Sequence, residues 1–149
     1  MKVLEAELMT ADVQVASILG LPFGADIASF KILGFASGMP YVIFYFYLPA
    51  ELGKEAIDLV YQYEAKNSWF SFTRYYREHK RLDLGTARQT FEAVAASAEQ
   101  SRLMQLAEGS ALFKVTSIIF ARQENPIELR RAYYRGDRYK FNISRDVIS

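Results

Sequence analysis

The chain has 149 residues, of which 51% are hydrophobic and 23% charged, so it can form one globular domain with a buried core. Its 18 basic and 17 acidic residues give a net charge of +1, which supplies neither the basic footprint expected for nucleic acid nor a polybasic membrane anchor. Because the chain contains no cysteine, disulfides, thiolate catalysis and cysteine-based zinc sites are excluded.

Two further patterns bear on location. The longest apolar run, residues 41–50, is too short to cross a bilayer as a helix. The first five residues lack the continuous apolar core of a signal peptide. We therefore expect a cytoplasmic protein that does not bind a membrane.

The first third of the chain predicts a strand, a helix and a β-hairpin. Residues 3–9 alternate and indicate a short strand. Thr10 can cap a helix with an apolar stripe at helical spacing, and Gly20 ends it. Residues 27–36 and 41–47 then form the clearest hairpin, because the intervening Ser-Gly-Met-Pro has turn chemistry.

The aromatic strand at residues 41–47 is strongly β-prone and is expected to be covered on both faces. Alternation divides its side chains between the two faces of the sheet. One face is expected to carry Tyr41, Ile43, Tyr45 and Tyr47, and the other Val42, Phe44 and Phe46.

The remaining two thirds predict three helices and four strands. The expected helices are residues 51–64, residues 68–79 with Ser68 as the cap, and a helix that starts at the capping box Ser97-Ala98-Glu99-Gln100. The expected strands are residues 84–95, 111–122, 127–135 and 139–143. Because hairpins dominate and βαβ repeats do not, the sequence predicts one α+β domain, residues 1–149, with a largely antiparallel sheet and helices packed on it.

A set of short motifs follows this order of elements along essentially the whole chain. They are Ile18-Leu19-Gly20-Leu21, Ser37-Gly38-Met39-Pro40, Tyr47-Leu48-Pro49, Ser68-Trp69-Phe70, Leu106-Ala107-Glu108-Gly109, Pro126-Ile127-Glu128 and Tyr134-Arg135-Gly136-Asp137-Arg138-Tyr139-Lys140-Phe141. In this order they resemble the UTRA domain, the effector-sensing half of bacterial regulators in the HutC branch of the GntR family.

The resemblance implies a chorismate-lyase-like α+β fold and a non-enzymatic role. Family members bind a small effector, which repositions an N-terminal winged helix-turn-helix domain that grips operator DNA, and they are usually homodimers. This chain has no such DNA-binding domain, so operator DNA would be contacted only through a domain outside it. No catalytic residue, metal or cofactor is expected.

The resemblance also marks the residues that would line the effector pocket. Glu128, Tyr134 and Ser68 match positions that line it in some relatives, and Phe70 belongs to the same motif as Ser68.

Three further pocket positions depart from the pattern of the sugar-phosphate-binding relatives. Those relatives place two arginines where this chain has Ile32 and Gly34, and often a polar or acidic residue where it has Phe44. We therefore do not expect this chain to bind a phosphate through such a pair of arginines. We expect a neutral, aromatic-contacting or cationic ligand, because an unpaired Glu128 carboxylate disfavours a nearby anion and aromatic walls supply apolar contact area.

Each of these residues also has a purely structural interpretation. Glu128 could form a surface salt bridge with Arg130 or Arg131. Tyr134 could be a core residue with a structural hydrogen bond, and Ser68 could be only a helix cap.

The conspicuous run Arg135-Gly136-Asp137-Arg138 is interpreted as structural, with a tight turn at Gly136 and with Arg138 paired either with Asp137 or with a neighbouring carboxylate. The single histidine, His79, is expected at a solvated helix end.

Two other functions compete with effector sensing. One is a lyase-type enzyme of the same fold, which the missing arginines and the scarcity of acid–base and nucleophilic residues disfavour. The other is a dimerisation module with a vestigial pocket.

Overall fold

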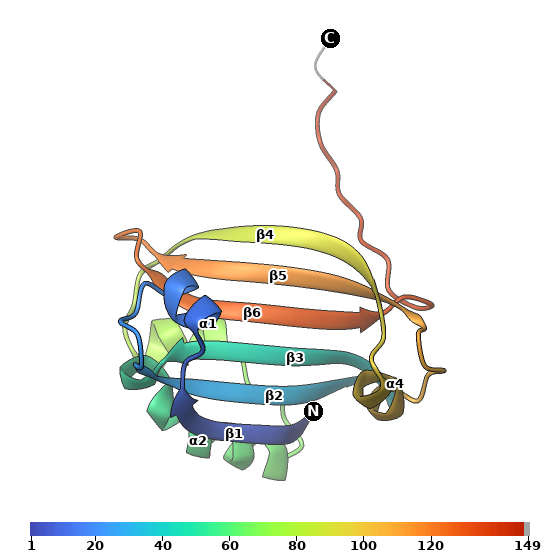
Figure 1. Cartoon of the computed structure of the whole chain (residues 1–149), viewed down its shortest axis with the longest axis horizontal. Helices are drawn as coiled ribbons and strands as arrows, with labels where there is room; N and C mark the ends of the chain where they lie inside the picture. The colour runs from blue at the N-terminus through green and yellow to red at the C-terminus, as the bar shows by residue number, and fades with distance from the viewer. Residues whose placement is uncertain (148–149) are drawn as a thin grey trace.

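A computed structural model describes residues 1–147 and shows a six-stranded sheet in the order β1-β2-β3-β6-β5-β4 (Figure 1). All five neighbouring pairs are antiparallel, as predicted. The strands are β1 (Lys2–Thr10), β2 (Asp26–Ala36), β3 (Met39–Pro49), β4 (Leu84–Ala95), β5 (Ala111–Ala121) and β6 (Pro126–Arg135). The helices are α1 (Val13–Ile18), α2 (Ala50–Ala65), α3 (Phe72–Arg74), the π-helical η1 (Tyr75–His79) and α4 (Ala98–Met104).

Helix α2 covers one face of the sheet, which we call the cavity face. It packs mainly on β1 and β2 and lies behind them in Figure 1. The approach is close: a Cβ added at Gly53 of α2 would lie 2.5 Å from the Cβ of Ala28 on β2. The main core cluster forms here, from side chains of β2, β3, α2 and the α3–η1 segment.

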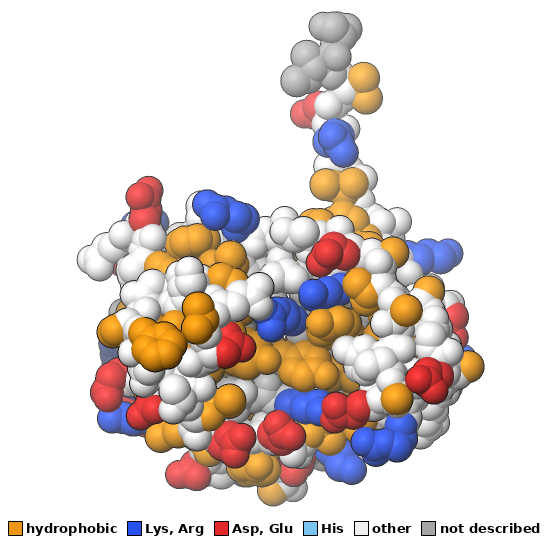
Figure 2. Space-filling model, viewed as in Figure 1, with side chains coloured by type: hydrophobic (Ala, Val, Ile, Leu, Met, Phe, Trp, Pro, Cys, Tyr) orange, Lys and Arg blue, Asp and Glu red, His pale blue; other side chains and the backbone are white. Residues whose placement is uncertain are grey.

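Helices α1 and α4 stand on the opposite face, which we call the open face (Figure 1). Figure 2 shows hydrophobic and basic side chains together in a hollow between these two helices. Three tyrosines there lie beneath cations at 5.6–5.7 Å: Tyr45 under Lys31, Tyr47 under Arg131 and Tyr133 under Lys114.

Several predicted elements are confirmed nearly residue for residue. Strand β4 has the predicted bounds, and the capping box at Ser97 is present, with both reciprocal hydrogen bonds to Gln100. The hairpin also forms as expected, but its turn is shorter than the predicted Ser-Gly-Met-Pro. Ser37 and Gly38, with φ of 51° and 76°, link β2 to β3 directly, and the next two residues already belong to β3. These features are local, so their sequence signals are direct.

The other two predicted N-caps, Thr10 and Ser68, are wrong by two and three residues. The cap of α1 is Asp12, which accepts from the Val15 amide at 2.8 Å, because β1 continues through Thr10. The cap of α3 is Ser71, which accepts from the Arg74 amide at 3.2 Å.

The helix predicted over residues 68–79 is therefore shorter than expected. Residues 68–71 are non-helical, α3 is a single turn, and the chain continues as five π-helical residues. The amide of Lys80 bonds to the Tyr75 carbonyl, which is the wider spacing of a π-turn. This winding buries the adjacent Tyr75 and Tyr76 side by side.

The strand predicted over residues 139–143 is wrong, since this part of the described chain contains no strand. Strand β6 already has β3 and β5 on its two edges, so a following segment finds no free edge beside it. Two aromatic side chains stack on the cavity face instead, Tyr139 on Tyr134 at 4.1 Å and Phe141 on Phe91 at 4.6 Å.

The predicted division of the aromatic strand is confirmed except at one residue. Val42, Phe44 and Phe46 lie on the cavity face, but so does Tyr41, whose ring is 5.8 Å from that of Tyr134. The pairing of β2 and β3 shifts by one residue here, and such a bulge breaks the alternation.

Helices of the described residues 1–147 all fall short of the length and apolarity required to span a bilayer.

Candidate functional site

A cavity of about 230 Å³ lies on the cavity face, between the sheet and residues 69–73. We call it the aromatic cavity. Its lining comes from β3, β6 and the segment that leads into α3: Phe44, Phe46, Trp69, Phe70, Ser71, Phe72, Thr73, Arg130 and Tyr134.

Strand register brings the sheet side of this cavity together. Val42 pairs with Tyr134, Phe44 with Ala132 and Phe46 with Arg130. Because alternate residues of a strand share a face, these side chains form one continuous floor. Phe44 lies at its centre.

Aromatic rings enclose this floor. The Phe44 ring is 5.5 Å from Trp69, 6.1 Å from Tyr134 and 5.4 Å from Phe46. Trp69 is 47% exposed and lies at the outer rim. The cavity therefore presents ring faces and edges from several directions.

A buried polar cluster lies beneath the aromatic cavity. Glu128 is fully buried, accepts a hydrogen bond from the Tyr76 hydroxyl, and has its Oε2 2.8 Å from Nη2 of Arg130. Burial raises the pKa of Glu128, and the Arg130 charge opposes that shift. Burial and the neighbouring Glu128 raise the pKa of Tyr76 well above its ordinary value, so this hydroxyl remains a donor.

Arg130 connects this cluster to the cavity. Its guanidinium carbon lies 5.1 Å from the centre of the Phe46 ring, and its side chain is 26% exposed. Its Nε is buried and finds no hydrogen-bond acceptor among residues 1–147. Arg130 is a cavity residue that was not predicted from the sequence, although its spacing of two from Glu128 on a strand indicates that the two share a face.

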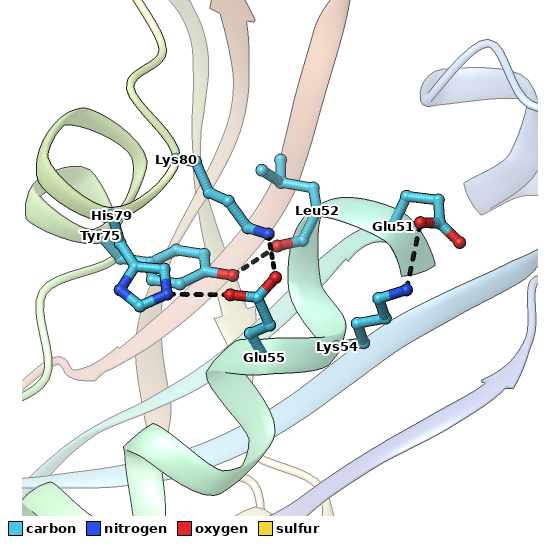
Figure 3. A network of polar contacts seen from close by, with 7 residues as sticks. All are labelled: Glu51, Leu52, Lys54, Glu55, Tyr75, His79 and Lys80. Atoms are coloured by element: carbon cyan, nitrogen blue, oxygen red, sulfur yellow. Dashed lines mark hydrogen bonds and ion pairs between the residues drawn. The ribbon is translucent and has the colours of Figure 1, made fainter.

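Helix α2 holds the α3–η1 segment in place (Figure 3). The Tyr75 hydroxyl donates to the Leu52 carbonyl at 2.6 Å, and burial raises the pKa of Tyr75 to about 12. Glu55 contacts His79 at 2.9 Å and Lys80 at 2.6 Å, and these two contacts lower its pKa. The aromatic wall of the cavity is thereby anchored to the helix that packs on the sheet.

A second cavity of about 170 Å³ lies on the other side of the same segment, between α2 and η1. It shares Trp69, Phe70 and Ser71 with the aromatic cavity. We regard the aromatic cavity as the candidate site because the sheet residues expected to bind a ligand, Phe44 and Tyr134, line that one.

The structure brings three of the predicted site residues together in this cavity: Phe44, Phe70 and Tyr134. Ser68 precedes the lining segment and is exposed, with its hydroxyl 3.4 Å from the Lys66 carbonyl. Its neighbour Ser71 lines the cavity in its place.

Three others lie below the cavity surface. Ile32 is 1% exposed in the main core and pairs with Phe44. Gly34 is covered by Val42, whose Cγ1 would be 2.7 Å from a Cβ at position 34. The expectation that Glu128 carries an unpaired carboxylate is wrong, since it pairs with Arg130 in the interior.

The motif at residues 135–138 is structural, as predicted, but its ion pair differs. Asp137 pairs with the buried Arg135, through contacts of 2.8 and 3.1 Å, in place of the expected Arg138. A Cβ at Gly136 would lie 2.6 Å from the Ala111 carbonyl oxygen, so this close backbone approach requires glycine.

Comparison with known proteins places the chain in a family. The UTRA domain family matches residues 1–140. The transcriptional repressor NagR of Bacillus subtilis is 22% identical over 148 residues, which cover 99% of this chain and 58% of NagR. The chain thus spans a little more than half the length of this relative.

Solved structures show the same fold. The ligand-binding domain assigned to a GntR-family transcriptional regulator of Bordetella bronchiseptica has a TM-score of 0.86 at 24% identity, with 97% of this chain and 89% of that one covered. A GntR-family regulator of Bacillus cereus has a TM-score of 0.82 at 18% identity, with 97% and 96% covered. PhnF of Mycobacterium smegmatis has a TM-score of 0.81 at 19% identity, with 99% and 62% covered.

The family match extends over nearly the whole chain. The chain therefore belongs to the UTRA domain family.

Proposed function

We propose that this domain senses a small-molecule effector in the aromatic cavity and thereby controls operator binding by a winged helix-turn-helix domain. The observation that carries the proposal is the convergence of Phe44, Tyr134 and Phe70 with the donor-bearing Arg130 around one cavity. Small-molecule sites are typically mostly apolar, with a few placed polar groups. We place the protein in the cytoplasm, where its operator would be.

The effector can act only by binding two arrangements of the protein with different affinity. Residues 69–73 form one wall of the cavity and continue into the segment that Tyr75 and His79 connect to α2. Since α2 packs on β1, a ligand that draws this wall inward also acts on the N-terminal strand. In this mechanism the strand passes the change to the DNA-binding domain.

We further propose a homodimer in which β4 lies at the interface. Strand β4 is at the edge of the sheet, and ten of its 12 residues are exposed. A long edge strand exposed on both faces is a template for pairing with another chain. Sedimentation equilibrium tests this: a concentration-dependent dimer that Phe91→Glu weakens supports the interface, and a monomer at every concentration contradicts it.

No catalytic role is proposed. Glu128, the buried carboxylate nearest the cavity, is engaged by Tyr76 and Arg130. Incubation with chorismate, followed for 4-hydroxybenzoate, separates the two functions, since turnover would support the lyase alternative.

The only tryptophan of the chain, Trp69, lies at the cavity rim and supplies a direct test of effector binding. A metabolite library is screened for compounds that both change its fluorescence and raise the melting temperature, since a ligand that binds only the native state stabilises it. Effectors found this way are then tested on operator binding by the full-length regulator.

Trp69→Ala is expected to weaken such binding, with the thermal shift as the readout. The matched control is Tyr61→Ala, since Tyr61 is 43% exposed on α2, away from the cavity lining. A library in which no compound binds, or equal effects of the two substitutions, would favour the vestigial pocket.

A further inference from the structure

Every polar side chain that lines the aromatic cavity can donate a hydrogen bond. Arg130 has only N–H groups, and the hydroxyl of Ser71 already accepts from the Arg74 amide, which leaves its proton to donate. Thr73 and Tyr134 add two more hydroxyls. The hydroxyls can also accept, but Arg130 can only donate, so a ligand that pairs with Arg130 must supply acceptors.

Among the polar side chains that line the cavity, Arg130 has the greatest capacity for further hydrogen bonds as a donor. One of its terminal nitrogens lies 2.8 Å from Glu128, and its guanidinium carbon lies over the Phe46 ring, 5.1 Å from the ring centre. In the described part of the chain, its Nε is buried without a hydrogen-bond acceptor and Oε2 of Glu128 is buried without a hydrogen-bond donor. The Arg130 side chain is nevertheless 26% exposed and lines the cavity, so a ligand oxygen can approach the part of the guanidinium that Glu128 does not engage.

Charge limits the ligand to one negative group. Glu128 balances part of the Arg130 charge, and Arg130 is the only lysine or arginine among the described residues that line the cavity. Two or more cationic groups are the usual arrangement around a phosphate dianion, whereas a guanidinium fork suits a single carboxylate.

The walls of the aromatic cavity limit the size and shape of the ligand. At about 230 Å³ the cavity is smaller than the roughly 300–1,000 Å³ of sites for drug-sized ligands. The rings of Phe44, Trp69 and Tyr134 offer surfaces for offset or edge-to-face stacking, which a planar group uses best.

We propose that the effector is a small molecule with a planar aromatic or conjugated group and a single carboxylate, which binds Arg130 while the planar group packs against Phe44 and Trp69. This assignment rests on the proposed function of the aromatic cavity. It replaces the neutral or cationic ligand expected from the sequence, because that expectation assumed a free Glu128 carboxylate.

Three probes of similar size test the class on the 149-residue chain: phenylacetate, phenylacetamide and phenyl phosphate. Trp69 fluorescence and thermal shift are recorded for each. Phenylacetate is expected to bind at least about tenfold more tightly than the other two, a difference of about 1.4 kcal/mol. Equal binding of the amide, tighter binding of the phosphate, or no response to phenylacetate overturns the proposal.

A pair of adjacent substitutions tests the residue. Arg130→Lys keeps a cation beside Glu128 but removes Nε and the planar fork, so phenylacetate affinity is expected to fall about tenfold or more. Arg131→Lys is the matched control, because Arg131 is the next residue on β6, faces the open face and lies over Tyr47. Equal effects of the two substitutions contradict the role of Arg130.

These outcomes separate the ligand class from the function. If Arg130→Lys does not fold, the comparison of the three probes on the unmodified chain still decides the class. If a neutral or cationic metabolite shifts both Trp69 fluorescence and operator binding while phenylacetate does neither, the carboxylate class fails and effector sensing stands. If no compound in the wider library binds, both fail.

Discussion

Gly53 allows the closest contact between α2 and the sheet, and Gly53→Ala tests how tightly that contact is packed. The added Cβ would lie 2.5 Å from the Cβ of Ala28 and 3.1 Å from the Cβ of Leu48. Carbon atoms prefer separations of about 3.5–4.0 Å. Because the Cβ atoms of Ala28 and Leu48 are fixed to strand backbones and cannot rotate away, α2 would have to shift by about 1 Å to relieve the contact.

Two effects of opposite sign set the change that Gly53→Ala makes in the free energy of unfolding. Alanine in place of glycine in a helix stabilises by about 0.5–1 kcal/mol. Overpacking a core costs about 1–3 kcal/mol, and a contact with no side-chain escape belongs at the upper end. Gly53→Ala should therefore lower the free energy of unfolding by about 1–2 kcal/mol net, or roughly 2–8 °C in melting temperature for a domain of this size.

Urea denaturation, followed by far-UV circular dichroism and by Trp69 fluorescence, measures the change. Lys54→Ala is the control, since Lys54 is the next residue and solvent-exposed, and it should stay within about 0.5 kcal/mol. Adding Ala28→Gly to Gly53→Ala should recover part of the loss, because it removes the closest contact. A Gly53→Ala variant as stable as the unmodified chain would refute the close packing of α2.

Three further changes follow from the polar contacts. Burial raises the pKa of Glu128, so its contribution to stability is fully present below its ordinary pKa of about 4.5 and is lost as the pH rises through the folded-state value. Glu128→Gln should therefore flatten this part of the curve of stability against pH. An unchanged curve would contradict the raised pKa. The pKa of Tyr75 is raised from 10.0 to about 12, so its contribution to stability is present below pH 10 and is lost between these two values. Tyr75→Phe should lower the free energy of unfolding by about 1 kcal/mol at neutral pH. In urea titrations, it should also remove the loss of stability at alkaline pH. Because Ser97 is an N-cap, Ser97→Ala should lower the free energy of unfolding by about 1 kcal/mol. Ser68 is not a cap, so Ser68→Ala should change the urea midpoint little. The reverse order would contradict the assigned caps.

The sequence by itself determined the features that depend on neighbours a few residues away. The bounds of β4, the hairpin turn at residues 37–38 and the capping box at Ser97 follow from alternation, turn chemistry and a reciprocal pair of hydrogen bonds. Alternation also placed Phe44 on the cavity face, and the ordered motifs pointed to the family. Each of these signals is local, so it can be recognised in the sequence without knowledge of the fold.

Tertiary structure decided where local preference met competition for space. The segment at residues 139–143 is β-prone, yet β6 has no free edge beside it, so its aromatic rings stack on the sheet instead. The helix expected over residues 68–79 is interrupted, and its π-helical part buries both Tyr75 and Tyr76.

The chemistry of the candidate site was decided in the same way. Alternation shows that Glu128 and Arg130 share a strand face, but it does not show whether a carboxylate on that face meets solvent, ligand or protein. Tyr76, 52 residues away in the sequence, packs over Glu128 and donates to it, and this burial favours pairing with Arg130. Only that long-range contact makes Glu128 part of the interior and leaves Arg130 to face the cavity.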